Sequence, residues 1–226
     1  MYRRLESAEI TATALALSDR VGARFPGSGL SHIAKELVGV CQDAAETAAW
    51  LGGPRRLLRV GVALGVLIVL VAFLGTVLGV RLRLAFTTFS EFVQGLQAAI
   101  QNFVFLGITV LFLLSLERRW KRRRALRALH SLRSIAHIID MHQLTKDPDR
   151  WSAAEADEDA LGTPDLIRYL DFCSDLLALI SKAAALYVQD FDDSSTLAAV
   201  NEIENLTAGL SRKIWQKIMI LDRIAP

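Results

Sequence analysis

Two long apolar runs lie in the middle of the chain, and amphipathic segments flank them on both sides. Residues 60–80 contain nothing more polar than Thr76, and as a helix these 21 residues would cover about 30 Å, the thickness of a bilayer's hydrocarbon core. The second run, 103–116, is shorter, so a crossing must include the preceding turns back to about Gln97. We predict a transmembrane helical hairpin with spans at about 58–80 and 97–117.

Polar residues accompany the second span: Gln97, Gln101 and Asn102 lie at membrane depth. Glu91, Gln94, Gln101 and Asn102 share one arc of the helix. Because polar groups are costly against lipid, this stripe should face protein or water. Two interpretations stay open: a hydrogen-bonded seam between helices, or the lining of a wet pore.

The second span is predicted to belong to one very long helix. Residues 88–91, Thr-Phe-Ser-Glu, fit a capping box that places a helix start just before Phe89. Neither proline nor a glycine pair occurs between Glu91 and Leu144. We expect one helix of about 54 residues that leaves the membrane and continues into the cytoplasm.

Basic residues give the orientation. Three arginines (55, 56 and 59) precede the first span and eight Lys or Arg follow the second, whereas the intervening loop has only Arg81 and Arg83. By the positive-inside rule, a multi-pass protein of the inner membrane with both termini in the cytoplasm is expected. The basic residues predicted to contact anionic headgroups are Arg118, Arg119, Lys121, Arg122, Arg123 and Arg124.

Small residues mark the first span as a packing helix. Gly61 with Gly65, and Gly75 with Gly79, form two GxxxG pairs. Such pairs allow close helix contact, either within the hairpin or with another subunit.

The flanking regions read as helices on both sides of the hairpin. An apolar stripe runs from residue 7 to Phe25 before a Pro-Gly turn, and a second stripe over 33–51, with Ser31 as N-cap, ends at Gly-Gly-Pro. Beyond the basic cluster, apolar residues from Ala125 to Ile139 share one face. A helix capped by Thr163 and a last helix after the turn at 190–195 complete an all-α chain.

The expected organisation has three parts. They are a cytoplasmic N-terminal helical hairpin (1–54), the transmembrane hairpin (55–117), and a cytoplasmic helical domain (118–226) with an exposed acidic loop at about 147–162. The formal net charge of +2 conceals a basic collar over 118–143 and an outer region, 144–226, with 15 acidic and 8 basic residues. This acidic outer region argues against nucleic acid as a partner.

Chemistry-bearing residues are sparse. Imidazole and carboxylate suit zinc, iron or manganese, but the metal candidates His130, His137 and Asp140 lack ligand spacing, and a one-turn His137–Asp140 hydrogen bond is the simpler interpretation. Asp190, Asp192 and Asp193 read as turn and helix-capping acids, and Cys41 and Cys173 as reduced packing residues. No hydrolase, nucleotide or dinucleotide motif occurs, so we expect neither catalysis nor a cofactor.

These patterns predict an integral membrane assembly or scaffold protein. It would oligomerise with itself, or dock a membrane protein partner, through its cytoplasmic bundle, with anionic lipids around the basic collar. The alternative is a homo-oligomeric ion channel lined by the polar stripe, and the third hypothesis is a membrane-anchored metal-dependent enzyme.

Overall fold

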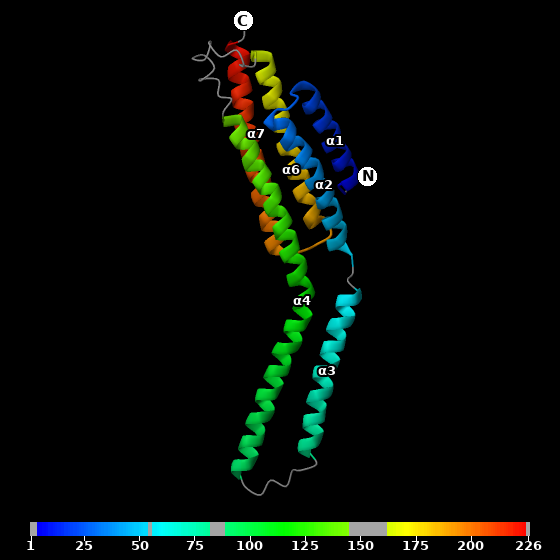
Figure 1. Cartoon of the computed structure of the whole chain (residues 1–226). Helices are drawn as coiled ribbons and strands as arrows, with labels where there is room; N and C mark the ends of the chain where they lie inside the picture. Colours follow the sequence, from blue (N-terminus) through cyan, green and yellow to red (C-terminus); the bar gives the residue numbers. More distant parts are fainter. Residues whose placement is uncertain (1–3, 54–55, 82–88, 145–161, 225–226) are drawn as a thin grey trace. The chain divides into compact units, whose positions relative to one another are not determined.

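The structure, a computed structural model, describes residues 4–53, 56–81, 89–144 and 162–224. These residues form α-helices and no strand, so the predicted all-α class is confirmed. The helices, labelled in Figure 1, are α1 (Ser7–Arg24), α2 (Gly29–Gly52), α3 (Arg56–Arg81), α4 (Phe89–Leu144), α6 (Thr163–Gln189) and α7 (Ser194–Ile224). They divide into two compact units: Met1–Gly53 together with Arg122–Pro226, and Pro54–Lys121.

The first unit is a helical bundle, which we call the bundle unit. It consists of α1, α2, α6, α7 and the part of α4 from Arg122 onward (Figure 1). Helix α6 is the most enclosed, because it packs against α1, α2 and α7. The apolar positions predicted to share one face on α4 are buried: Ala125, Leu129, Leu132, Ala136 and Ile139. On α6, the buried residues at helical spacing are Leu166, Leu170, Cys173, Leu177, Ile180, Ala184 and Tyr187.

The turn between α1 and α2 is fixed by its end residues. Gly27 has φ +72°, a backbone conformation that favours glycine, and Phe25 stacks edge-on against Tyr169 at 5.5 Å between ring centroids. The prediction that Ser31 caps α2 is wrong: Ser28 is the N-cap, and its Oγ accepts from the Ser31 N–H at 3.2 Å. Because Ser28 is the N-cap, α2 begins at Gly29, directly after the Pro26-Gly27 turn.

The start of α6 lies at the predicted residue, but the predicted cap is wrong. Thr163 is the first helical residue, and the N-cap position belongs to Gly162, which has no side chain to accept a hydrogen bond. Pro164 fits the first turn because its missing N–H would have no helical partner there, and Asp165 complements the positive end of the helix.

The long helix is confirmed. Helix α4 runs without interruption through 56 residues from Phe89 to Leu144. Its predicted capping threonine, Thr88, and almost all of the predicted acidic loop lie outside the described residues.

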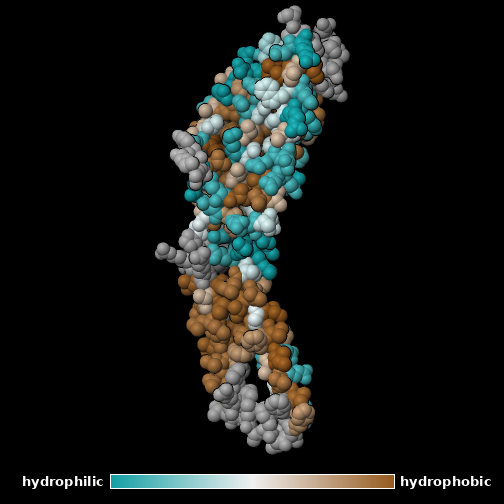
Figure 2. All heavy atoms as spheres, turned by 180° about the vertical axis from the view of Figure 1, so that it is seen from behind, coloured by the Kyte–Doolittle hydropathy of each residue, from teal (hydrophilic) through white to brown (hydrophobic). Residues whose placement is uncertain are grey.

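The second unit, Pro54–Lys121, contains α3 and the first part of α4, and we call it the hairpin unit. Figure 2 shows apolar residues over most of its visible surface, whereas the visible face of the bundle unit mixes polar and apolar residues. Among the described residues, one helical segment, Val93–Leu144, is long and apolar enough to cross a membrane, and its most apolar window is not buried at all. Val60–Gly75 on α3 is a shorter apolar segment.

Candidate functional site

The polar stripe on α4 is exposed throughout its described part. The side chains of Gln94, Gln97, Gln101 and Asn102 are all exposed, and none has a hydrogen-bond partner among the described residues. The side chain of Glu91 lies outside the described residues. Four carboxamides, each able to donate and to accept, are therefore available for a partner.

Helix α3 packs on a different side of α4. The half-buried residues of α4 in this region include Leu106, Val110 and Leu113, and a Cβ placed on Gly65 of α3 would lie 3.6 Å from Leu113. At about 100° per residue, this contact face is about 150° away from the glutamines. Hence α3 does not cover the glutamine stripe within one chain.

Of the three described glycines among the four predicted to pack, only Gly65 has a near neighbour from α4. A Cβ on Gly61 or Gly75 would meet nothing within 4 Å, and the surroundings of Gly79 lie outside what the structure describes. Gly61 and Gly75 therefore leave two bare patches on α3.

Arg122 has an internal role in the bundle unit. Its Nε lies 2.9 and 3.1 Å from the two carboxylate oxygens of Asp193, and its Nη2 lies 2.7 Å from Oδ2. The Asp193 side chain is only 2 % exposed and also accepts from the Thr196 N–H at 3.0 Å, so it is the N-cap of α7. One carboxylate thus joins α4 to the start of α7.

Other residues of the basic cluster also contact protein groups. In the hairpin unit, Lys121 is buried and pairs with Glu117 at 3.2 Å. In the bundle unit, the Arg124 guanidinium lies 4.6 Å from the centre of the Trp50 ring, a cation–π contact. Arg119 and Arg123 are exposed and form no ion pair among the described residues. The Arg119 guanidinium lies 5.3 Å from the centre of the Phe112 ring.

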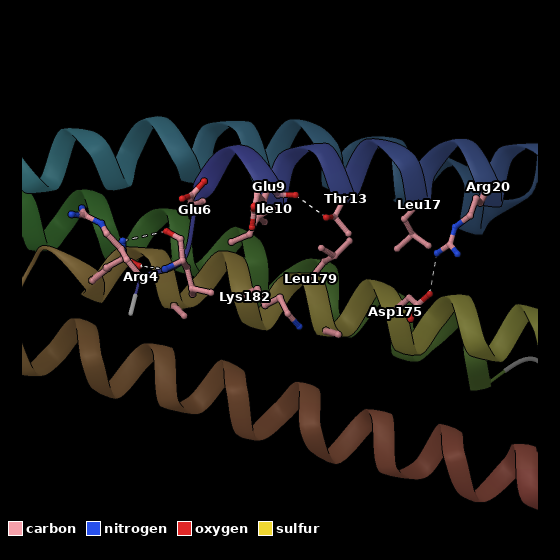
Figure 3. Close-up of a pocket in the computed structure, with 14 residues that line it drawn as sticks. Arg4, Glu6, Glu9, Ile10, Thr13, Leu17, Arg20, Asp175, Leu179 and Lys182 are labelled. Carbon is pink, nitrogen blue, oxygen red and sulfur yellow. Dashed lines mark hydrogen bonds and ion pairs between the residues drawn. The ribbon is translucent and has the colours of Figure 1, made fainter. Parts of the chain in front are cut away.

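A groove of about 890 Å³ lies between α1 and α6 on the bundle unit (Figure 3). Its floor includes Ile10, Leu17 and Leu179, and its rim carries charges of both signs. Among the described residues, Glu6, Glu9 and Lys182 of this rim form no ion pair. An apolar centre with a polar rim is the composition of a protein interface.

Both ends of the groove are closed by contacts between α1, its preceding residues and α6. Arg20 pairs with Asp175 at 3.2 Å at one end (Figure 3). At the other end, Gln189 accepts from the Leu5 N–H at 2.9 Å, and Arg4 pairs with Asp190. The groove therefore has a defined length, set by these contacts.

The candidate metal ligands do not come together. His130 and His137 are exposed, and Asp140 accepts from Gln143 Nε2 at 2.6 Å, so the expected His137–Asp140 hydrogen bond is wrong. Within the described ranges, no group of three or more His, Cys, Asp or Glu could hold a metal ion.

The two cysteines are buried as separate thiols. Burial raises the pKa of Cys41 to about 11 and that of Cys173 to about 12, the latter against a smaller opposing effect of Lys217. Since the thiolate is the reactive form, both are poor nucleophiles at neutral pH.

The sequence pattern missed two features of the bundle unit. Asp193 was expected to be a capping acid, but its pairing with Arg122 was not foreseen, and the α1–α6 groove was not foreseen at all. Both depend on which helices are neighbours, which periodicity within one helix does not encode. Comparison with protein families, curated proteins and solved structures gave no match.

Proposed function

We propose that this chain is a two-span integral membrane assembly protein whose cytoplasmic bundle docks partners or further copies. The supporting observation is that segments from both sides of the apolar region build one core. Val21 and Leu37 come before that region, Leu177 and Ile214 come after it, and all four are buried in the same cluster. The chain leaves the bundle unit at Gly53 and re-enters it at Arg122, so both ends of the intervening segment lie on one side of any membrane.

A segment with both ends on one side crosses a membrane an even number of times. The unburied apolar window of α4 lies in the middle of the chain, unlike a signal sequence, and it is exposed, unlike the core helix of a soluble protein. If α4 crosses, α3 must cross back, and its 26 residues span about 39 Å as a helix, which is enough. The excess of basic residues outside the loop favours the cytoplasm for the bundle unit.

The lipid contacts of the proposal involve fewer residues than the whole basic cluster. Arg122 pairs with Asp193, Arg124 with Trp50 and Lys121 with Glu117. Headgroup binding is therefore assigned first to Arg119 and Arg123, which are exposed and form no ion pair among the described residues. The assembly role draws support from the groove between α1 and α6, whose mixed lining suits a protein partner better than a small substrate.

Cysteine labelling in intact cells tests the membrane placement. A membrane-impermeant maleimide should modify Ser90→Cys, which precedes the second span, and should not modify Ser194→Cys in the bundle unit until the cells are opened. The unchanged chain is the control, since Cys41 and Cys173 are fully buried and should not react. Labelling of Ser194→Cys with protection of Ser90→Cys would mean that the orientation is the reverse of the one proposed. Labelling of both variants, or of neither, would contradict the transmembrane hairpin.

An ion channel is the second candidate, and a specific observation favours it. The exposed carboxamides of Gln94, Gln97 and Gln101 face away from α3, as residues lining a shared pore would. A ring of several copies could hold water along that stripe. The two candidates differ in whether the stripe is dry or wet.

A further inference from the structure

We infer that the glutamine face of α4 is a dry, parallel contact with a second copy of this chain. The inference rests on the proposed membrane placement, because only there does a row of exposed carboxamides along one helix face favour a protein partner. Water satisfies an exposed glutamine at a soluble surface, whereas hydrocarbon supplies neither donors nor acceptors. In one chain, Gln94, Gln97 and Gln101 have no partner among the described residues, and α3 packs on the opposite side of the helix.

The exposed face follows the spacing of a coiled coil. Gln94, Gln101 and Ile108 recur every seven residues, and Gln97, Val104 and Leu111 follow each of them by three. All six side chains are exposed, including Val104 at 52 %, Ile108 at 59 % and Leu111 at 68 %. A seven-residue repeat of this kind is the pattern by which two helices pack with left-handed crossing, in membranes as in water. We call these six residues the α4 seam.

The chemistry of the α4 seam identifies its occupant as a second copy. A carboxamide has a partly positive N–H₂ and a partly negative oxygen, so its partial charges are complementary to those of another carboxamide. Two copies in one membrane share the same orientation, and a two-fold axis along the membrane normal brings Gln101 opposite Gln101. The seam extends from 94 to 111, about 26 Å, which nearly equals the hydrocarbon thickness.

Asn102 provides a matched control within the same turn. It is exposed and carries the same functional group as Gln101, but it lies about 130° around the helix from the centre of the α4 seam. A change at Asn102 therefore tests the effect of a carboxamide at the same depth without touching the seam.

Oxidative cross-linking of the full chain in liposomes tests the contact. Gln101→Cys and Val104→Cys should give a disulfide-linked dimer on a non-reducing gel, and Asn102→Cys should give at least about fivefold less. Cys41 and Cys173 can remain, because both are completely buried. Equal yields at Gln101 and Asn102, or no dimer from either seam position, would overturn the inference.

A second measurement follows the carboxamides themselves. In energy-transfer assays between labelled copies, Gln101→Leu should weaken dimerisation about threefold, and joint replacement of Gln94, Gln97 and Gln101 by Leu about 25-fold, whereas Asn102→Leu should change it less than twofold. Unchanged dimerisation of the triple variant would contradict the role of the amides.

Thiol modification separates the dry contact from a pore. A charged, water-soluble methanethiosulfonate added to the reconstituted protein should fail to modify Gln101→Cys, since a dry seam excludes water. Rapid modification would overturn the dry contact and favour the channel. The proposed membrane placement is judged separately by the labelling of Ser90→Cys and Ser194→Cys, so either can fail while the other stands.

Discussion

At the scale of single residues, the carboxylate of Asp193 joins two helices. The nearly buried carboxylate accepts hydrogen bonds from Arg122 of α4 and from the first turn of its own helix. Burial would raise the pKa of Asp193, but the hydrogen bonds from Arg122 and Thr196 outweigh burial and hold the pKa below its ordinary value of 3.8. The folded state therefore binds the ionised form more tightly than the unfolded chain does.

Replacing Asp193 should destabilise the bundle unit. Asp193→Ala removes both the cap and the ion pair, and because Arg122 is partly exposed we expect a loss of about 3 kcal/mol, or about 10 °C in melting temperature. Asp193→Asn should cost less, since asparagine also caps helices well. Asp19→Asn on the exposed face of α1 serves as the control and should leave the melt in detergent unchanged.

The difference in stability between the natural chain and the Asp193 variants should depend on pH with a definite sign. Because the pKa is lower in the folded state, the stabilisation by Asp193 is complete above about pH 4 and disappears as the pH falls through the folded pKa. The advantage of the natural chain over Asp193→Asn should shrink in acid. An advantage that grew on acidification would contradict the assigned pairing.

At the scale of elements, the helix starts depend on single residues that periodicity does not locate. Ser28 Oγ accepts from the Ser31 N–H and donates to the Phe25 carbonyl at 2.8 Å, so it holds both the turn and the start of α2. Helix α6 begins one residue after Gly162 and has no side-chain cap. Two hydroxyl residues that lie at helix starts, Ser28 and Thr163, thus have different roles.

This difference can be measured with two parallel substitutions. Ser28→Ala should lower stability by about 1 kcal/mol, or about 3 °C in a circular-dichroism melt, because an N-cap is lost. Thr163→Ala should leave the melting temperature nearly unchanged, since no cap hydrogen bond comes from it. Equal effects of the two substitutions would mean that the caps are assigned wrongly.

The helices and their buried faces were predictable because burial imposes a repeat along the chain. Positions such as Leu129, Ile180 and Ile214 follow the helical period, and all are buried. Caps were not predictable to the residue, since Ser28 and Ser31 are the same residue type and the extended backbone at Ser28 makes it the cap. The Arg122–Asp193 pair and the α1–α6 groove required knowledge of which helices are neighbours, and the exposed direction of the glutamine stripe required the position of α3.

At the scale of the whole molecule, the assembly-protein hypothesis and the channel hypothesis predict different ionic currents across a bilayer. We expect purified protein in planar bilayers to be silent, because a dry α4 seam leaves no water path between copies. Reproducible cation currents that weaken with Glu91→Gln would favour the channel, since a ring of carboxylates at a pore mouth attracts cations. Glu46→Gln on the exposed face of α2 controls for the removal of a carboxylate elsewhere and should have no effect.

The hydrogen bond between Leu5 and Gln189, which is 184 residues further along the chain, has a consequence for how the protein folds during its synthesis. A ribosome that adds about 5–20 residues per second needs about 9–37 s to make the chain between them. During that time α1 and α2 can pack on each other but exist without α6, the helix against which both also pack. The two helices are therefore translated well before the helix that completes their core, and the bundle unit can close only after the whole intervening segment has been made.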